Sequence, residues 1–297
     1  MNIKNLSATL LFFVVVAESF SQDNLLEQLK EETVVETEKT ASTFKGTRLV
    51  NGHSVETRKT GVLDFMISHR FGRINTGSYE FFGLDQANIR LGLEYALSDR
   101  LTLGAGRNSF NKRYDAFVKY RLLWQDSGNS GTPISLTWLS NTAINTTRRP
   151  DLPMNTQRRL GYAHQMLIAR KFSPDLSLQL MPTYVHRNMV ETPDEINAMI
   201  ALGMGGRYKL SNRVSLNLEY YYRFQEGNLP SYNAMAIGLD IETGGHVFQL
   251  HLTNAREMTE VGFIPATSGD PFSGDIHFGF NISRTFHLKN QPNGKEW

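Results

Sequence analysis

Residues 90–106 read RLGLEYALSDRLTLGAG and place two alternating runs on either side of a tight turn. Before the turn, every second residue is apolar: Ile89, Leu91, Leu93, Tyr95 and Leu97. A repeat of two residues is that of a β-strand, because successive side chains point to opposite faces. Ser98 and Asp99 can hydrogen-bond their own backbone and close the turn. The stretch therefore predicts a β-hairpin with one apolar face.

Similar turns recur downstream, in KFSPDLSL at 171–178 and KLSNRVSL at 209–216, with looser copies at 128–136 and 242–250. Their spacing of about 35–40 residues fits two strands and a longer loop. The alternation is continuous from residue 60, and it predicts an all-β fold, a closed antiparallel up-and-down transmembrane β-barrel of about 12 strands. The strands are expected at 60–71, 86–97, 100–110, 112–124, 132–142, 159–172, 175–187, 197–209, 213–224, 232–242, 245–254 and 274–288.

The alternating rows indicate which face meets lipid. On 213–224 the apolar row runs from Val214 to Phe224, and the opposite row includes Glu219 and Arg223. A charge on a lipid-facing wall costs about 2–4 kcal/mol at mid-depth, so the apolar row is expected outside and the hydrophilic row inside. A soluble barrel would reverse the rows, and the pattern alone fits both. An export signal, the strand lengths and the aromatic residues of the last strand favour lipid outside.

Bulk composition bounds the function. The chain has 297 residues, a net charge of +2 and a mean hydropathy of −0.34. So small a net charge does not indicate nucleic-acid binding, and so polar a chain is not a helical bundle in lipid. The absence of cysteine excludes disulfides, thiolate metal sites and cysteine nucleophiles.

The chain divides into four expected parts. Residues 1–21 predict a cleaved signal peptide, because Lys4 precedes an apolar run too short to span a bilayer. Residues 22–59 are expected to form a periplasmic N-terminal segment, whose Asn51–Gly52 turn belongs either to a small hairpin outside the barrel or to a segment tucked into its mouth. Residues 60–290 are the predicted outer-membrane β-barrel, and 291–297 a C-terminal tail. Short and long loops alternate except at 110–112, as in outer-membrane barrels whose short turns face the periplasm.

Four segments carry a likeness to a known family: FKGTRLVNGHSVE at 44–56, GVLDFMISHRFG at 61–72, FFGLDQANIRLGLEY at 81–95 and DRLTLGAGRNSF at 99–110. They resemble an uncharacterised outer-membrane β-barrel family, a domain of unknown function, of Bacteroidetes-type Gram-negative bacteria. The resemblance covers roughly residues 44–290 and implies the fold and the outer-membrane location. It supplies no substrate and no catalytic residue.

No motif for catalysis or for a cofactor stands out. The eight histidines are scattered and form no HExxH pattern or carboxylate cluster, and no G-x-S-x-G elbow is present. The glycines of 104–106 and 203–206 lie inside predicted strands, where glycine relieves crowding under bulky neighbours. Asp270 and Asp275 are too sparse a set for a calcium site. The prediction is therefore that no residue serves catalysis, a cofactor or a metal.

The inward rows supply the candidate site, a set of charged residues of both signs that should line the lumen. The set is Asp64, Arg90, Glu94, Lys119, Arg121, Glu219 and Arg223. Such a row can line a narrow water-filled channel, or it can fill a closed barrel with ion pairs. The leading interpretation is a non-catalytic outer-membrane barrel that acts as a narrow channel or small-solute transporter, and the alternative is a closed structural or binding barrel.

Two further interpretations stay open. An outer-membrane lipid hydrolase would need a serine and a histidine together on the lipid-facing wall, and His69 and His164 fall on or near apolar rows. A secreted soluble β-protein would bind glycans or partners through its long loops. The expected partners are outer-membrane lipid and the barrel-assembly machinery, without nucleic acid, and the sequence indicates no particular solute or partner protein.

Overall fold

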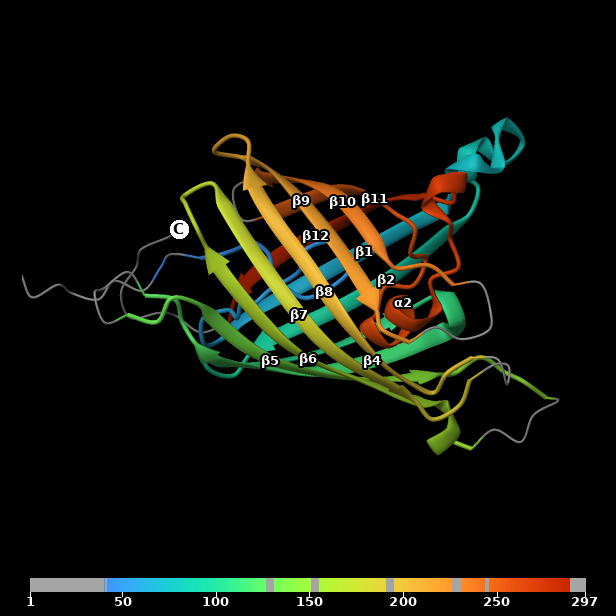
Figure 1. The fold of residues 1–297 in the computed structure, drawn as a ribbon, viewed down its shortest axis with the longest axis horizontal. Helices are drawn as coiled ribbons and strands as arrows, with labels where there is room; N and C mark the ends of the chain where they lie inside the picture. The colour runs from blue at the N-terminus through green and yellow to red at the C-terminus, as the bar shows by residue number, and fades with distance from the viewer. Residues whose placement is uncertain are drawn as a thin grey trace, which may run out of the picture.

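Each strand from β1 to β12 pairs antiparallel with its neighbours in sequence, and β1 pairs with β12, so that the sheet closes into a barrel (Figure 1). The computed structural model describes residues 40, 42–126, 131–150, 155–190, 195–225, 231–243 and 246–288. The strands are β1 Val62–Arg73, β2 Ala87–Ala96, β3 Leu101–Asn108, β4 Arg113–Leu123, β5 Ser135–Asn145, β6 Leu160–Lys171, β7 Leu176–Arg187, β8 Ala198–Lys209, β9 Val214–Arg223, β10 Met235–Thr243, β11 His246–Thr253 and β12 His277–His287. The predicted fold class is confirmed, and every strand begins and ends within three residues of its predicted bounds.

The two ends of the barrel differ in their connections. At one end, the short-turn end, β2, β6 and β8 are each followed by a turn of four residues, at 97–100, 172–175 and 210–213. The other end, the long-loop end, carries longer connections with short helices. These helices are η1 Ile74–Thr76, η2 Ser78–Gly83, η3 Phe110–Lys112, η4 Gln157–Arg159, α2 Glu260–Ala266 and η5 Pro271–Ser273. Figure 1 shows α2 folded back into this end of the barrel.

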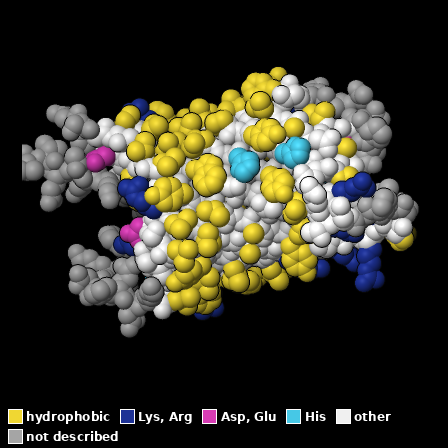
Figure 2. All heavy atoms as spheres, turned by 90° about the horizontal axis from the view of Figure 1, so that it is seen from below, with side chains coloured by type: hydrophobic (Ala, Val, Ile, Leu, Met, Phe, Trp, Pro, Cys, Tyr) yellow, Lys and Arg dark blue, Asp and Glu magenta, His cyan; other side chains and the backbone are white. Residues whose placement is uncertain are grey.

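The outer wall is apolar. The predicted outward residues Leu91 and Leu93 of β2 and Leu218 and Tyr222 of β9 are exposed, and their neighbours in sequence are buried inside. Figure 2 shows hydrophobic side chains over the wall, with lysine and arginine gathered at its two ends. Arg284, which falls on the outward parity of β12, lies near the short-turn end with its guanidinium carbon 5.0 Å from the centre of the Phe286 ring. An interfacial position lets such a side chain reach the headgroups.

Within the described residues, no helix is long and apolar enough to cross a membrane. The expected signal peptide, residues 1–21, and the expected tail, residues 291–297, lie outside the described residues, as does most of the segment before residue 42.

The interior is occupied by two segments that do not belong to the wall. Residues 43–56, here called the lumenal hairpin, have buried side chains that include Phe44, Leu49 and Val55. From the long-loop end, α2 places Phe263 and Ile264 in the same buried cluster. The lumen is therefore filled by protein along much of its length.

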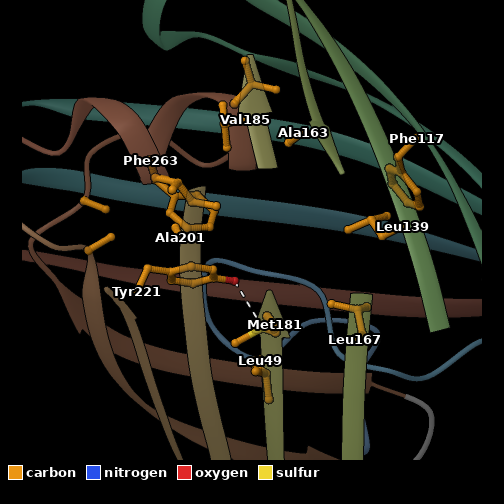
Figure 3. Close-up of a cluster of buried hydrophobic side chains, with 14 of the residues drawn as sticks. Leu49, Phe117, Leu139, Ala163, Leu167, Met181, Val185, Ala201, Tyr221 and Phe263 are labelled. Atoms are coloured by element: carbon orange, nitrogen blue, oxygen red, sulfur yellow. Dashed lines mark hydrogen bonds between the residues drawn. The ribbon is translucent and has the colours of Figure 1, made fainter. Parts of the chain in front are cut away.

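The interior wall has two unlike sides. The inward rows of β1, β2, β4 and β9 hold all seven residues of the predicted lumenal set and are together called the charged side, although β5 to β8 separate β9 from β4. The inward rows of β5, β6 and β7, the apolar side, have no charged residue among their buried members and contain Leu139, Leu167 and Met181. In Figure 3, Leu49 of the hairpin lies beside Met181, and Phe263 of α2 belongs to the same buried cluster as Leu139 and Leu167. The inward rows expected to be hydrophilic are mixed on the apolar side, where buried polar residues such as Thr137 and Gln179 stand among apolar ones that pack against protein.

Candidate functional site

The lumenal hairpin enters the barrel from the short-turn end and returns to it. At its start, the Thr40 amide donates to the Gln125 carbonyl at 3.0 Å, in the connection after β4. At its exit, the Thr60 amide donates to the Asp99 carboxylate, in the turn after β2, at 2.8 Å. Between these points the chain reverses at the predicted Asn51–Gly52 turn, where the Leu49 amide donates to the Gly52 carbonyl at 2.9 Å. Of the two placements considered for this turn, the structure has it inside the barrel.

Glu219 holds the tip of the hairpin. Its carboxylate, which projects inward from β9, accepts hydrogen bonds from the backbone amides of Val50 at 2.9 Å, Asn51 at 3.0 Å and Gly52 at 3.0 Å. The carboxylate is 3 % exposed and has no ion pair among the described residues. Three converging N–H groups compensate a buried negative charge in place of a cation.

The tip of the hairpin packs closely against the wall because both the hairpin and the wall have glycine at their points of contact. A Cβ atom on Gly52 would lie 2.1 Å from the Tyr221 hydroxyl, so any other residue would push the turn off β9. On the wall, a Cβ atom on Gly205 would lie 2.4 Å from the Leu49 side chain. Within the run 203–206, whose glycines were expected to relieve crowding, Gly205 therefore makes room for the hairpin, and Gly203 makes room for Tyr221 and Met181.

Lys119 and Arg121 hold the two arms of the hairpin. The Lys119 ammonium donates to the carbonyls of Thr47 at 3.2 Å and Glu56 at 2.7 Å, which lie on opposite arms. The Arg121 guanidinium pairs with the Glu56 carboxylate at 3.0 Å. Both cations lie on β4 and point inward as predicted. Their partners, however, belong to the hairpin and not to the facing wall.

Neutral side chains of the wall complete the attachment. Gln179 accepts from the Val55 amide at 2.6 Å and donates to the His53 carbonyl at 2.8 Å. Gln249 and Asn281 donate to the carbonyls of Leu49 and Val50, at 2.6 Å and 3.1 Å. The hairpin is thus bonded through its main chain by side chains from several strands around the barrel. Sequence reasoning missed these amides because it selected charged residues alone, although the inward parity of their strands was already predicted.

The hairpin and α2 also contact each other. Arg48 of the hairpin lies 3.5 Å from the Glu260 carboxylate of α2 and 3.6 Å from the Glu94 carboxylate of β2. His53 lies 3.8 Å from the Glu260 carboxylate. Neither His53 nor Glu260 belongs to a strand. Burial lowers the pKa of His53, and Arg48 lowers it further. Burial raises the pKa of Glu260, and the nearby Arg48 guanidinium opposes that rise. The two occluding segments therefore meet around a buried cation.

The structure places all seven residues of the predicted lumenal set in the interior, in three kinds of contact. Asp64 pairs with Arg58 at 2.6 Å and Arg90 pairs with Asp115 at 2.5 Å, close to the wall. Glu94, Lys119, Arg121 and Glu219 contact the hairpin. Arg223 donates to Ser231 and Asn233, at 2.8 Å and 3.3 Å, in the connection after β9. Whether ions or solutes pass this set stays a prediction.

On the outer wall, Ser140 of β5 and His164 of β6 are directly paired neighbours on adjacent strands. The Ser140 hydroxyl lies 3.0 Å from Nδ1 of the His164 ring. The other histidine considered for this face, His69, stacks on Phe280 with ring centres 4.8 Å apart. Across the described residues, histidine and carboxylate side chains form no cluster of three that could hold a metal ion. Asp270 caps the Phe272 amide, and Asp275 accepts from Asn75 and pairs with Arg73, so both have protein partners.

A closed antiparallel barrel with an apolar outer wall belongs to the class of β-barrels that span membranes. Residues 44–286 match the family described as "Membrane bound beta barrel domain (DUF5777)", and the chain belongs to that family. The predicted resemblance to a barrel domain of unknown function is confirmed; the bacterial group that it implied stays a prediction. A comparison with curated protein sequences gives no match.

Several solved barrels share the general architecture. The NanC porin is 8 % identical with a TM-score of 0.47, over 77 % of this chain and 100 % of that one. The KdgM porin is 11 % identical with a TM-score of 0.46, over 76 % of this chain and 99 % of that one. Outer membrane phospholipase A from Escherichia coli is 14 % identical with a TM-score of 0.43, over 75 % of this chain and 92 % of that one. Likeness at this level carries no inference about a solute or a reaction.

Proposed function

We propose that this protein is an outer-membrane channel for small solutes, held closed by its lumenal hairpin and opened when the hairpin withdraws toward the short-turn end. The carrying observation is the way in which the charged side is paired. Glu219 and Lys119 bond only to the main chain of the hairpin among the described residues. Without the hairpin, both charges would face the lumen and be hydrated, as in a water-filled pore.

A permanently closed barrel does not need this arrangement. Its wall could pair its own charges with one another, as Arg90 of β2 and Asp115 of β4 do. Here the wall instead offers carboxylate, ammonium and amide groups to peptide groups, which water can replace one for one. The entry and exit of the hairpin lie at the same end, so withdrawal requires no rearrangement of the strands.

A reversible crosslink tests the proposal directly. The chain contains no cysteine, and the side-chain amide of Asn51 donates to the Thr253 hydroxyl of β11 at 3.2 Å. The pair Asn51→Cys with Thr253→Cys would tie the tip of the hairpin to the wall when oxidised. In planar bilayers, the oxidised protein should show no openings, and reduction should restore them. Asn51→Cys alone, under the same oxidant, is the matched control and should show no redox dependence.

Two results would contradict the channel. Steady conductance of the oxidised protein would mean that ions bypass the hairpin. An absence of openings in wild type and in the reduced variant would leave the closed structural or binding barrel as the better account.

A lipid hydrolase is a second candidate, favoured only by the Ser140–His164 pair on the outer wall. A serine activated by a histidine is the usual pair of a hydrolase. Here, however, no carboxylate among the described residues contacts His164, and two polar groups facing lipid would pair in any case because neither has water. Unchanged phospholipid release by His164→Ala, compared with wild type, would remove this candidate.

A further inference from the structure

The wall of the lumen holds the lumenal hairpin by its peptide groups. Side chains of the wall bond to a main-chain N–H or C=O group of eight of the ten residues from 47 to 56, namely 47, 49–53, 55 and 56. Every residue except proline carries the same two groups. These contacts therefore recognise a peptide chain as such. The wall residues, from six strands, are Lys119, Thr137, Gln179, Glu219, Gln249 and Asn281.

The wall groups are placed as an extended chain requires. Gln179 accepts from the Val55 amide and donates to the His53 carbonyl, and Thr137 donates to the Val55 carbonyl. Residues two apart present their N–H and C=O groups along the same edge of an extended chain, which is the edge that a neighbouring strand would bond. Gln179 and Thr137 thus take the place of a pairing strand along one arm of the hairpin.

Two glycines of the wall leave room for side chains beside these bonds. A Cβ atom on Gly205 of β8 would meet the Leu49 side chain, and a Cβ atom on Gly238 of β10 would lie 3.2 Å from the Val50 side chain. Both glycines belong to inward rows. In peptide-binding sites, main-chain hydrogen bonds give affinity and spaces for side chains give preference. The wall combines both features at the tip of the hairpin.

We infer that the lumen is a binding site for short peptides and that the hairpin occupies this site in the closed barrel as an internal copy of the solute. The inference rests on the proposed channel, since the site is free only when the hairpin has withdrawn. A peptide that enters would take over the bonds of Glu219, Lys119 and Gln179. The hairpin fills the lumen with two arms, so a single extended chain fits the same space.

Such a peptide would hold the hairpin out of the lumen. A ligand that binds one state of a protein raises the population of that state in proportion to one plus the ratio of ligand concentration to dissociation constant. A peptide at ten times its dissociation constant should therefore raise the withdrawn population about tenfold.

Maleimide labelling of Asn51→Cys, in the refolded full chain, measures that population. Asn51 is buried at the tip and the chain has no cysteine of its own, so the thiol reacts when the hairpin has left the wall. The probe is the tetrapeptide Leu-Val-Asn-Gly, the sequence of residues 49–52, acetylated and amidated at its ends. It should raise the labelling rate up to about tenfold. Capped tetra-alanine should also raise the rate, because its main chain is the same.

Two control probes and one variant locate the effect. Leu-Val-Asn-Gly methylated on its valine, asparagine and glycine nitrogens lacks the N–H groups that Glu219 accepts, and it should leave the rate unchanged. Maltotriose, which has no peptide group, should also leave it unchanged. Adding Glu219→Gln to Asn51→Cys should raise the rate without peptide and reduce the further increase that the peptide causes. The boiling-dependent shift in gel mobility shows that each variant is folded.

The outcomes separate the inference from the proposed channel. Labelling that occurs without peptide and is not accelerated by Leu-Val-Asn-Gly would overturn the inference and leave the channel standing. Acceleration by Leu-Val-Asn-Gly but not by tetra-alanine would overturn the assignment to peptides as a class. Equal acceleration by the methylated peptide or by maltotriose, or an unchanged peptide effect in Glu219→Gln, would overturn recognition through the main chain. A thiol that is never labelled would overturn both, because the hairpin would not withdraw.

Discussion

The two sides of the interior wall hold the same hairpin by different means. The charged side holds it through Glu219, Lys119 and Arg121, which bond to its main chain and to Glu56. The apolar side packs Leu139, Leu167 and Met181 into one cluster with Leu49 and Phe263, and adds hydrogen bonds from Thr137 and Gln179 to the main chain of the hairpin. Contacts of the first kind can be exchanged for water at small net cost, and those of the second kind cannot. Under the proposed function, the apolar side stabilises the closed barrel and the charged side controls whether the hairpin stays in the lumen.

The largest expected effect is on the apolar side. Leu167→Ala removes a side chain that is 0 % exposed and leaves a cavity against the hairpin and α2. Such truncations cost about 2–5 kcal/mol of unfolding free energy. Thermal unfolding in detergent should show the loss, compared with the outward-facing Leu218→Ala as control. A loss as small as that of the control would mean that the cluster does not support the fold.

A smaller loss of stability, with a larger change in conductance, is expected at Glu219. Glu219→Gln keeps the shape of the side chain but offers one acceptor oxygen to the three amides of the hairpin tip. We expect a cost of about 2 kcal/mol to the closed state and an increase in openings of about tenfold or more. Bilayer recordings measure it, and Leu167→Ala run in parallel should change the openings less. A larger increase in openings for Leu167→Ala than for Glu219→Gln would contradict the different roles given to the two sides.

The smallest expected effect is the loss of a single hydrogen bond on the apolar side. The Thr137 hydroxyl of β5 donates to the Val55 carbonyl at 2.7 Å. Thr137→Val keeps the volume and should cost about 1 kcal/mol of unfolding free energy. Because Leu139 and its neighbours still pack against the hairpin, openings should stay at the wild-type rate. A rise like that of Glu219→Gln would mean that any bond to the hairpin controls the channel, whichever side supplies it.

The fold could be predicted because the barrel repeats a local signal. Each strand alternates two kinds of side chain, as on β9, where Leu218 faces out and Glu219 faces in, and the turns recur at regular spacing. The direction of every charged residue of the lumenal set follows from that parity.

The contents of the lumen could not be predicted in the same way. The residues at 44–56 show a turn but no periodicity that selects an inside or outside position, and α2 is only seven residues long. Their burial depends on contacts such as Glu219 with Gly52, which are 167 residues apart in the chain. The apolar side was missed for this reason: Leu139 and Leu167 match no pattern until the segment that covers them is placed.

The hairpin directly precedes β1, the strand that closes the barrel against β12. Assembly therefore has to place the hairpin in the lumen when β1 pairs with β12. Under the proposed function, a barrel that closed without the hairpin inside would be a permanently open pore. Tension applied to the chain at residue 40 would act on one arm of the lumenal hairpin, whose other arm is bonded to the barrel at residue 60. A pull on residue 40 would break the bonds to the hairpin one after another, beginning with those nearest residue 40, while the strands of the barrel stay in register.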